Sequence, residues 1–168
     1  MPRRPACLTG SSANLWFDDG DTARIERMIV VKAYKIDHIG IAVASIADSL
    51  PIYEALGLAE AHREIVASQG VRTAFLPIGD SSIELLEPTS EDSPVAKFLA
   101  KRGGGVHHVC LAVDDIEAAL RDLAARGFRL LQSEPLDGAR GKRVAFLHPA
   151  SGNGVLIELS QEPARTKR

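Results

Sequence analysis

The chain has 168 residues and a net charge of −2, which suits one domain or two small modules and provides no basic field for nucleic acid. Hydrophobic residues make up 45% and charged residues 25%, as in globular rather than disordered proteins. No apolar run approaches the roughly 18 residues of a membrane span, and two cysteines cannot build a disulfide or zinc-finger framework. We therefore expect a reduced, cytoplasmic protein without a nucleic-acid or membrane partner.

The first stretch differs from the rest of the chain. Residues 1–27 mix Pro, Gly and Ser with an acidic DDGD cluster and show neither helical nor strand periodicity. They lack the apolar core of a secretory signal, and their acidic residues are unlike a transit peptide. We predict that residues 1–33 form a disordered leader, or come from a start site placed too early, and that the folded body begins at 34.

The first half of the body predicts a strand, a helix and three more strands. Residues 36–43 are rich in β-branched residues and bounded by polar turns, and Ser45 with Asp48 has capping-box spacing. Pro51 cannot lie inside an unbroken helix without loss of a hydrogen bond, so the helix either kinks there or begins near Ser49. Further strands are predicted at 60–66, 71–78 and 81–87.

The second half repeats this order after a linker. Residues 93–105 predict a helix that ends at three glycines. A strand over 106–113 is then followed by apolar residues at helical spacing up to Gly127. The remaining predicted strands are 128–133, 142–148 and 154–160.

The two halves are copies of one module. Segment 38–50 aligns without gaps onto 108–120 at an offset of 70, and the Ile-Glu-Leu around Glu84 recurs around Glu158 at an offset of 74. The predicted fold class is α+β, with two tandem βαβββ modules. Its predicted parts are a first module at 34–90, a linker helix at 91–104, a second module at 105–162 and a tail at 163–168. Because neither copy holds a complete site, 34–162 should form one cooperative domain.

Strand parity turns the repeat into a candidate site. In both first strands the bulky residues share one face, while His38 or His108 lies on the other among small residues, which suits a ligand cavity. Glu84 and Glu158 point away from their apolar neighbours, and a buried acid needs a partner or a metal. If the modules pack with pseudo-twofold symmetry, these four side chains converge. Two imidazoles and two carboxylates suit one divalent metal ion of borderline hardness (Co, Mn, Zn, Ni or Fe) with open positions for substrate.

Several other residues allow more than one interpretation. A single strand histidine or glutamate is usually structural or solvated, but here the same pair recurs in both halves, which favours the metal site. His107 has the opposite parity and should be structural or support a ligand, and Cys110 should be a packing residue. Arg140, Lys142 and Arg143 in DGARGKR could meet an anionic group, although a solvated charge run is the commoner arrangement. Two further histidines, His62 and His148, are expected on the surface and in a loop.

These motifs carry a family resemblance. The paired modules, each with a histidine on the first strand and an acid on the last, resemble the vicinal oxygen chelate (glyoxalase-like) superfamily. Within it, IDHIGIAV, GGGVHHVCLAVDDIEAAL and GKRVAFLHPASGNGVLIELSQ are similar to the methylmalonyl-CoA epimerase family, over about 34–162. By matching position, the resemblance implies that the metal ligands are His38, Glu84, His108 and Glu158.

The resemblance also implies an activity, that of an isomerase that interconverts (2R)- and (2S)-methylmalonyl-CoA through a metal-stabilised enolate, in propionyl-CoA (propionate) metabolism. The partner would be a small-molecule CoA thioester, and a homodimer is expected by analogy. Glu158 is the predicted catalytic base on one face, with Glu84 or a bound water on the other. In some members a glutamate four residues after the Gln of a Gln-Gly-Val stretch is a candidate base, but here that position is Thr73, which cannot serve as one.

Three other functions stay open at this point. A glyoxalase I-type lyase (lactoylglutathione lyase) would use the same metal and the same proton abstraction on a glutathione hemithioacetal. An extradiol-type dioxygenase needs Fe(II) on two histidines and one carboxylate, which four ligands in two symmetric pairs fit less well. A drug-sequestering protein of the same fold would need no metal.

Overall fold

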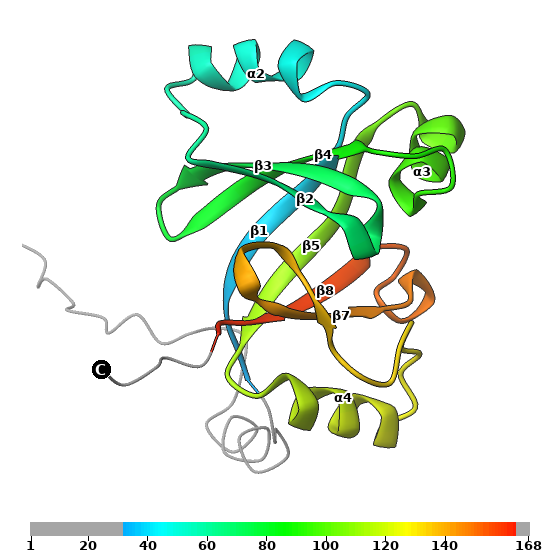
Figure 1. Cartoon of the computed structure of the whole chain (residues 1–168). Coiled ribbons are helices and arrows are strands. Elements are labelled where there is room, and N and C mark those ends of the chain that lie inside the picture. The colour runs from blue at the N-terminus through cyan, green and yellow to red at the C-terminus, as the bar shows by residue number, and fades with distance from the viewer. Residues whose placement is uncertain (1–31, 164–168) are drawn as a thin grey trace, which may run out of the picture.

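The computed structural model describes residues 32–163, in which eight strands form one strongly curled sheet (Figure 1). The strands are Ala33–Ala42 (β1), His62–Val66 (β2), Val71–Ile78 (β3), Ser81–Pro88 (β4), Gly105–Val113 (β5), Leu136–Asp137 (β6), Arg143–Leu147 (β7) and Leu156–Gln161 (β8). The helices are Ile46–Ala55 (α2), Pro94–Arg102 (α3) and Ile116–Ala125 (α4), with short 3-10 turns at Ala67–Gln69 (η1), Ala139–Gly141 (η2) and Pro149–Ser151 (η3). None of the helices in this range is both long and apolar enough to cross a membrane. The predicted leader and tail lie outside the described residues, apart from 32, 33 and 163.

The sheet confirms the α+β fold with two tandem modules. Its strand order is β2-β3-β4-β1-β5-β8-β7-β6, so each module supplies four neighbouring strands. The first strands of the two modules, β1 and β5, pair antiparallel at the centre, and each has the last strand of its own module beside it in parallel. The two halves are therefore related by a pseudo-twofold axis between β1 and β5, with α2 and α4 at opposite ends of the molecule (Figure 1).

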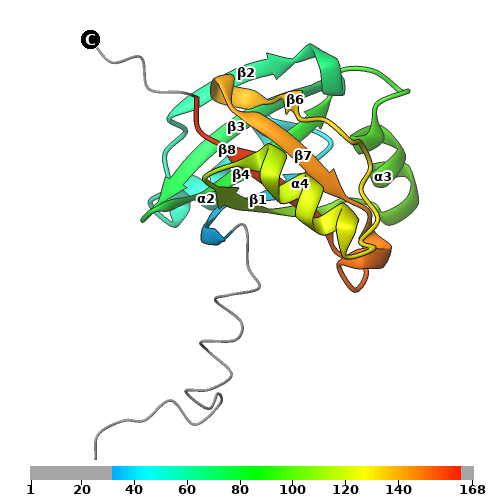
Figure 2. The same cartoon turned by 90° about the horizontal axis from the view of Figure 1, so that it is seen from below.

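The helices cover the bulky faces of the first strands, as parity predicts. Ile41 of β1 packs in a cluster around the fully buried Ile46 of α2, and Leu111 of β5 packs against the cluster of Ile116 on α4. Burial of one such side chain stabilises the fold by about 1.5–3 kcal/mol. Figure 2 shows α4 lying across the strands of the second half. The opposite, small-residue faces of β1 and β5 are left to line the inside of the curled sheet.

Both helices that follow a first strand are also anchored at their N-termini in the same way. The amide of Ile46 donates to Oε2 of Glu87 at 2.8 Å, and the amide of Ile116 donates to Oε1 of Gln161 at 2.8 Å. Each acceptor lies near the end of the last strand of the same module, so it ties the helix to the sheet and partners an otherwise unpaired helical donor. The repeat thus extends to side-chain hydrogen bonds.

The start of α2 resolves the ambiguity at Pro51. The helix begins at Ile46, and Oγ of its N-cap Ser45 accepts from the amide of Asp48 at 3.2 Å. A start near Ser49 is therefore wrong, because the side-chain cap at Ser45 favours the earlier turn. Pro51 lies inside the helix, where its ring nitrogen cannot donate to the preceding turn.

The strand predicted at 128–133 is wrong. There the chain makes only an isolated bridge between Leu130 and Leu147, and the β6 strand that pairs with β7 comes later, after Pro135. Pro135, directly before β6, has no amide hydrogen to donate to a sheet ladder. Leu130 packs against the core of the second half, whereas Phe128 and Leu131 are exposed.

Candidate metal-binding active site

Four buried side chains meet on the inner face of the sheet, one from each of its four central strands. They are His38 on β1, Glu84 on β4, His108 on β5 and Glu158 on β8, and we call them the His/Glu cluster. Each is at most 5% exposed. The pairing of Gly40 with Glu84 and of Cys110 with Glu158 puts a small residue beside each carboxylate and leaves room for the facing imidazoles. The structure thus brings together all four residues that the sequence singles out.

The donor atoms of the cluster lie at ligand-like spacing. The Nε2 atoms of the two histidines are 3.0 Å apart. Nε2 of His38 lies 3.1 Å from Oε2 of Glu84, and Nε2 of His108 lies 3.0 Å from Oε2 of Glu158. The two crossed distances, from each histidine to the other glutamate, are 3.4 and 3.7 Å.

This spacing fits a single divalent ion. Donors held about 2.1 Å from an ion are separated by about 3.0 Å in octahedral and about 3.4 Å in tetrahedral arrangements. Two imidazoles and two carboxylates are the donor set of borderline divalent metals, and several such metals share it. The four residues therefore suit a divalent metal ion, but the donor set alone does not determine which metal it is.

Without an ion, the cluster is held together by imidazolium–carboxylate pairs. Burial disfavours the charged form of His108, but the charge and hydrogen bond of Glu158, with those of Glu84, outweigh it and raise the pKa of His108 to about 9. The pKa of His38 is likewise raised, while both glutamates have lowered pKa values because the histidines outweigh the effect of burial. A metal ion entering this site must therefore displace protons from the histidines.

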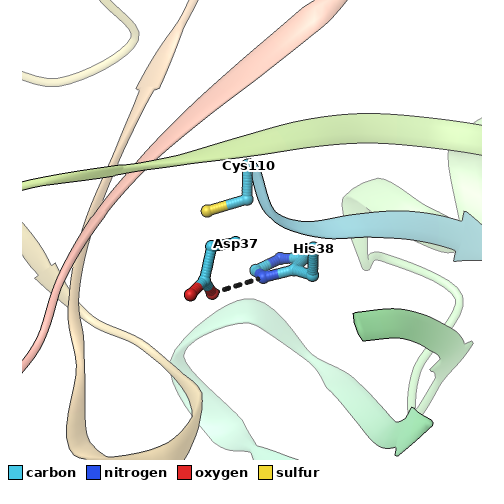
Figure 3. A group of neighbouring side chains, drawn as sticks. All are labelled: Asp37, His38 and Cys110. Atoms are coloured by element: carbon cyan, nitrogen blue, oxygen red, sulfur yellow. Dashed lines mark hydrogen bonds and ion pairs between the residues drawn. The ribbon is translucent and has the colours of Figure 1, made fainter. Parts of the chain in front are cut away.

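Two β-bulges place a supporting residue behind each histidine. In the pairing of β1 with β5, one extra residue precedes each histidine of the cluster: Asp37 before His38 and His107 before His108. Oδ2 of Asp37 lies 2.9 Å from Nδ1 of His38 (Figure 3), and the Nδ1 atoms of His107 and His108 are 3.0 Å apart. Each bulge residue thus engages the nitrogen that points away from the cluster, which fixes the tautomer and the direction of the ligating nitrogen.

Asp37 is the supporting residue that the sequence interpretation missed. Its Oδ1 accepts from Nζ of the buried Lys142 at 2.7 Å. Burial would raise the pKa of Asp37, but hydrogen bonds to His38 and Lys142 outweigh it and hold the pKa well below its usual range. An available signal was the offset of 70, which aligns Asp37 with His107.

A second cluster of potential ligands beside the first is a hydrogen-bonded network. Asp37, His38 and Cys110 bring their polar atoms within 4.8 Å of one another (Figure 3). The ammonium of Lys142 already occupies Asp37, and burial together with the charge of Glu158 raises the pKa of Cys110 to about 11. The thiol therefore stays protonated, and a cation would have to compete with the lysine.

The charged segment DGARGKR divides into three different roles. Lys142 is buried between Asp37 and Glu162, at 2.7 Å from each, so it is not part of a solvated charge run. Arg143 is exposed and pairs with Glu117 at 2.8 Å, as expected of a surface residue. Arg140 lines the cavity in front of the His/Glu cluster.

Polar and apolar side chains together line the cavity in front of the cluster. Its lining beyond the cluster is Val66, Gln69, Thr73, Phe75, Ala139, Arg140, Lys142 and Val144. Oγ1 of Thr73 is buried and makes no hydrogen bond to the described residues. A mostly apolar pocket of about 240 Å³ adjoins this cavity at His108 and is lined by residues such as Leu86 and Phe146. The site therefore combines a polar centre with an apolar annex.

The remaining histidines lie where the sequence predicts. His62 is exposed and pairs with Glu64 at 2.9 Å. His148 caps the turn after β7, where its Nδ1 accepts from the amide of Ala150 at 3.1 Å. Neither contributes to the His/Glu cluster.

Comparison with known proteins identifies the family. Residues 37–146 match the family model of the Glyoxalase/Bleomycin resistance protein/Dioxygenase superfamily. The mitochondrial methylmalonyl-CoA epimerase of Dictyostelium discoideum is 40% identical over 130 residues, which cover 76% of this chain and 78% of that protein. The chain belongs to the methylmalonyl-CoA epimerase family.

Other relatives extend the match. The ethylmalonyl-CoA/methylmalonyl-CoA epimerase of Cereibacter sphaeroides is 42% identical over 130 residues, 76% of this chain and 97% of that protein. A solved variant of the Streptomyces coelicolor methylmalonyl-CoA epimerase, in complex with 2-nitronate-propionyl-CoA, is 43% identical, with a TM-score of 0.77 over 79% of this chain and 97% of that one. The resemblance to the methylmalonyl-CoA epimerase family is therefore confirmed in both sequence and fold.

Proposed function

We propose that this protein is a metal-dependent isomerase that interconverts (2R)- and (2S)-methylmalonyl-CoA and serves propionyl-CoA metabolism. The observation that carries the proposal is the His/Glu cluster, in which the two histidine Nε2 atoms lie 3.0–3.7 Å from each other and from the carboxylate oxygens, in a member of this epimerase family. The substrate is a small CoA thioester, in keeping with the CoA ligand of the Streptomyces coelicolor structure. The homodimer and the cytoplasmic location stay predictions from the sequence.

The reaction moves one acidic hydrogen between the two faces of C2. A divalent ion bound by the four cluster residues would act as a Lewis acid that stabilises negative charge on the thioester oxygen. The protein itself must hold the thioester and carboxylate in one plane and keep the carbanionic carbon away from bulk water. Every cluster residue is buried, so the site keeps bulk water away from the reacting carbon. Charge–charge interactions are also stronger in a cavity that excludes solvent.

We assign removal of the C2 proton to Glu158. Its carboxylate lies at the cavity and is held ionised, because its interactions with His108 and His38 outweigh the effect of burial and lower its pKa. A positioned carboxylate contributes about 10²–10⁴-fold as a general base.

Return of the proton to the opposite face needs a second group. Glu84 lies across the cluster from Glu158, and the two acids belong to different modules. We assign the second transfer to Glu84 or to a water held in the cavity. Thr73 lies in the same cavity, but its hydroxyl is not a base at neutral pH.

Exchange of the α-hydrogen tests the proposal directly. Metal-loaded protein incubated with one methylmalonyl-CoA epimer in D₂O should produce the other epimer with deuterium at C2. Glu158→Gln should lower both rates by at least about 100-fold, since the amide cannot take a proton. The matched control is Glu117→Gln, because Glu117 is exposed and pairs only with Arg143 among the described residues.

Two results would contradict the proposal. Full exchange by a Glu158→Gln variant that still binds its metal would remove Glu158 as the base. Turnover of methylglyoxal with glutathione, together with no turnover of methylmalonyl-CoA, would instead identify a glyoxalase I-type lyase.

A further inference from the structure

Arg140 has an unusual backbone conformation at the edge of the cavity. Its φ of 57° lies in the left-handed region, which residues other than glycine rarely adopt. The conformation is held from the other half of the molecule, since the amide of Arg140 donates to Oε1 of Glu64 on β2 at 2.7 Å. Such strain persists only where surrounding contacts impose it, and it is concentrated at functional sites.

This backbone directs the Arg140 guanidinium to the His38 side of the cavity. Its Cζ lies 4.3 Å from the ring centroid of Phe75, as in a cation–π contact. Phe75 in turn stands edge-on to His38, with ring centroids 5.9 Å apart. The Arg140 side chain is one-third exposed, whereas the cluster residues are at most 5% exposed, so a ligand entering from solvent reaches Arg140 first.

The charge of Arg140 is not required to neutralise Asp37. That carboxylate already pairs with His38 at 2.9 Å and with Lys142 at 2.7 Å, whereas its contact with Arg140 is 3.5 Å long. Among residues 32–163 this long contact is the single side-chain hydrogen bond of the guanidinium. Most of its donors are therefore available to an anionic ligand, and their planar fork matches a carboxylate.

We infer that Arg140 binds the free carboxylate of the acyl group and makes the site specific for malonyl-type thioesters over neutral acyl thioesters. The inference rests on the proposed function, because it assigns a role to Arg140 in binding that substrate. The substrate class stays that of the proposed function, thioesters with a carboxylate on the carbon next to the thioester carbonyl. Arg140 is then a specificity-determining residue, and proton transfer stays with the cluster.

Binding of two CoA thioesters that differ by one carboxylate tests the inference. We would measure the Kd of malonyl-CoA and of acetyl-CoA for the metal-loaded wild type and for Arg140→Met, by titration calorimetry. Methionine keeps a long side chain over Phe75. Like arginine, it has a Cβ, so the cost of the left-handed backbone conformation at position 140 is unchanged. The preference for malonyl-CoA should fall by about 10-fold to 100-fold, as expected for loss of a charge-assisted hydrogen bond. Arg143→Gln, which removes an exposed charge three residues away, is the matched control and should leave the preference unchanged.

The same comparison with malonyl-pantetheine and acetyl-pantetheine separates the acyl carboxylate from the nucleotide phosphates. Loss of preference in both pairs supports the inference. Equal weakening of malonyl-CoA and acetyl-CoA that disappears with the pantetheine thioesters would overturn it, because Arg140 would then contact phosphate. An unchanged preference in Arg140→Met, or no preference in the wild type, would also overturn it.

Two safeguards keep the test decisive. If Arg140→Met does not fold, Arg140→Lys, which keeps the charge and loses the fork, must still reduce the preference. Failure of the wild type to epimerise methylmalonyl-CoA would remove the proposed function, whereas the binding comparison would still decide whether Arg140 reads a carboxylate.

Discussion

The stability of the metal-free protein should depend on pH in a defined direction. Without an ion, His108 has a pKa of about 9 instead of its ordinary 6.5, because its carboxylate partners outweigh burial. Because His108 binds its proton more tightly in the folded state, protonation stabilises the fold fully below pH 6.5. This contribution is lost as the pH rises through 9. The shift corresponds to about 3 kcal/mol of unfolding free energy.

The other cluster residues set the limits of this window. The pKa of His38 is also raised, so it contributes in the same direction, while the lowered pKa values of Glu84 and Glu158 stabilise the fold above about 4.5. These are the same ion pairs seen from both partners, so the contributions do not add separately. The contribution of the His/Glu cluster to the stability of the metal-free protein should therefore be largest between about pH 4.5 and 6.5.

Urea unfolding with a chelator at pH 6 and pH 9 measures the effect. The free energy of unfolding should be about 3 kcal/mol lower at pH 9, and added metal should remove the loss because metal ligation requires deprotonated histidines. An exposed-histidine control, His62→Gln, should show the same loss as the wild type. Equal stability of the chelated protein at both pH values would refute the ion-paired description of the cluster.

Three substitutions test the groups around the cluster. A Cβ on Gly40 would lie 2.3 Å from Cε1 of His108, so Gly40→Ala should displace the ring and lower metal affinity at least about 10-fold in competition with a chromophoric chelator; unchanged affinity would contradict this close approach. Asp37→Asn should weaken metal binding about 10-fold to 100-fold in calorimetry, because the amide orients His38 less strongly, and an unchanged Kd would show that Asp37 does not act through this ligand. Thr73→Val should keep epimerase activity. It should leave the unfolding free energy unchanged or raise it by up to about 1 kcal/mol, because it removes a buried hydroxyl without a partner among the described residues. Loss of turnover would show that this hydroxyl takes part in the reaction.

The repeat made the central architecture predictable. Once two copies were recognised, alternation along the strands put His38 and His108 on one face, and the parallel last strands put Glu84 and Glu158 beside them. The prediction of their position succeeded because four buried polar side chains impose a strong and repeated pattern on short apolar strands. That pattern needs no knowledge of the loops.

Strand alternation does not predict the residues that contact the cluster histidines from behind. Asp37 and His107 break the alternation because each is the extra residue of a bulge, and a bulge is set by the register between β1 and β5. Those strands are about 70 residues apart in sequence, so the sequence of either strand alone does not predict their register. Arg140 was similarly ambiguous, since its place at the cavity depends on the contact of its amide with Glu64 in the other module.

The pseudo-symmetry of the site also raises a problem that its asymmetric surroundings solve. The two oxygens of a malonyl thioester that can approach a metal, one from the thioester and one from the carboxylate, are nearly equivalent in position, so a symmetric site would accept the substrate in two orientations. The two sides of the cluster differ, however. His38 is backed by Asp37 and faced by Arg140 across Phe75, while His108 is backed by His107 and adjoins the apolar pocket.

The two backing groups differ in charge as well. Burial and the neighbouring charge of His108 lower the pKa of His107 to about 4, so it is neutral, whereas Asp37 is an ionised carboxylate paired with Lys142. A carboxylate held by Arg140 would lie on the His38 side and leave the uncharged thioester arm to the apolar side. Duplication accounts for the four equivalent cluster residues. A carboxylate held by Arg140 would let the diverged neighbours set one substrate orientation, so that each proton-transfer group keeps to its own face of C2.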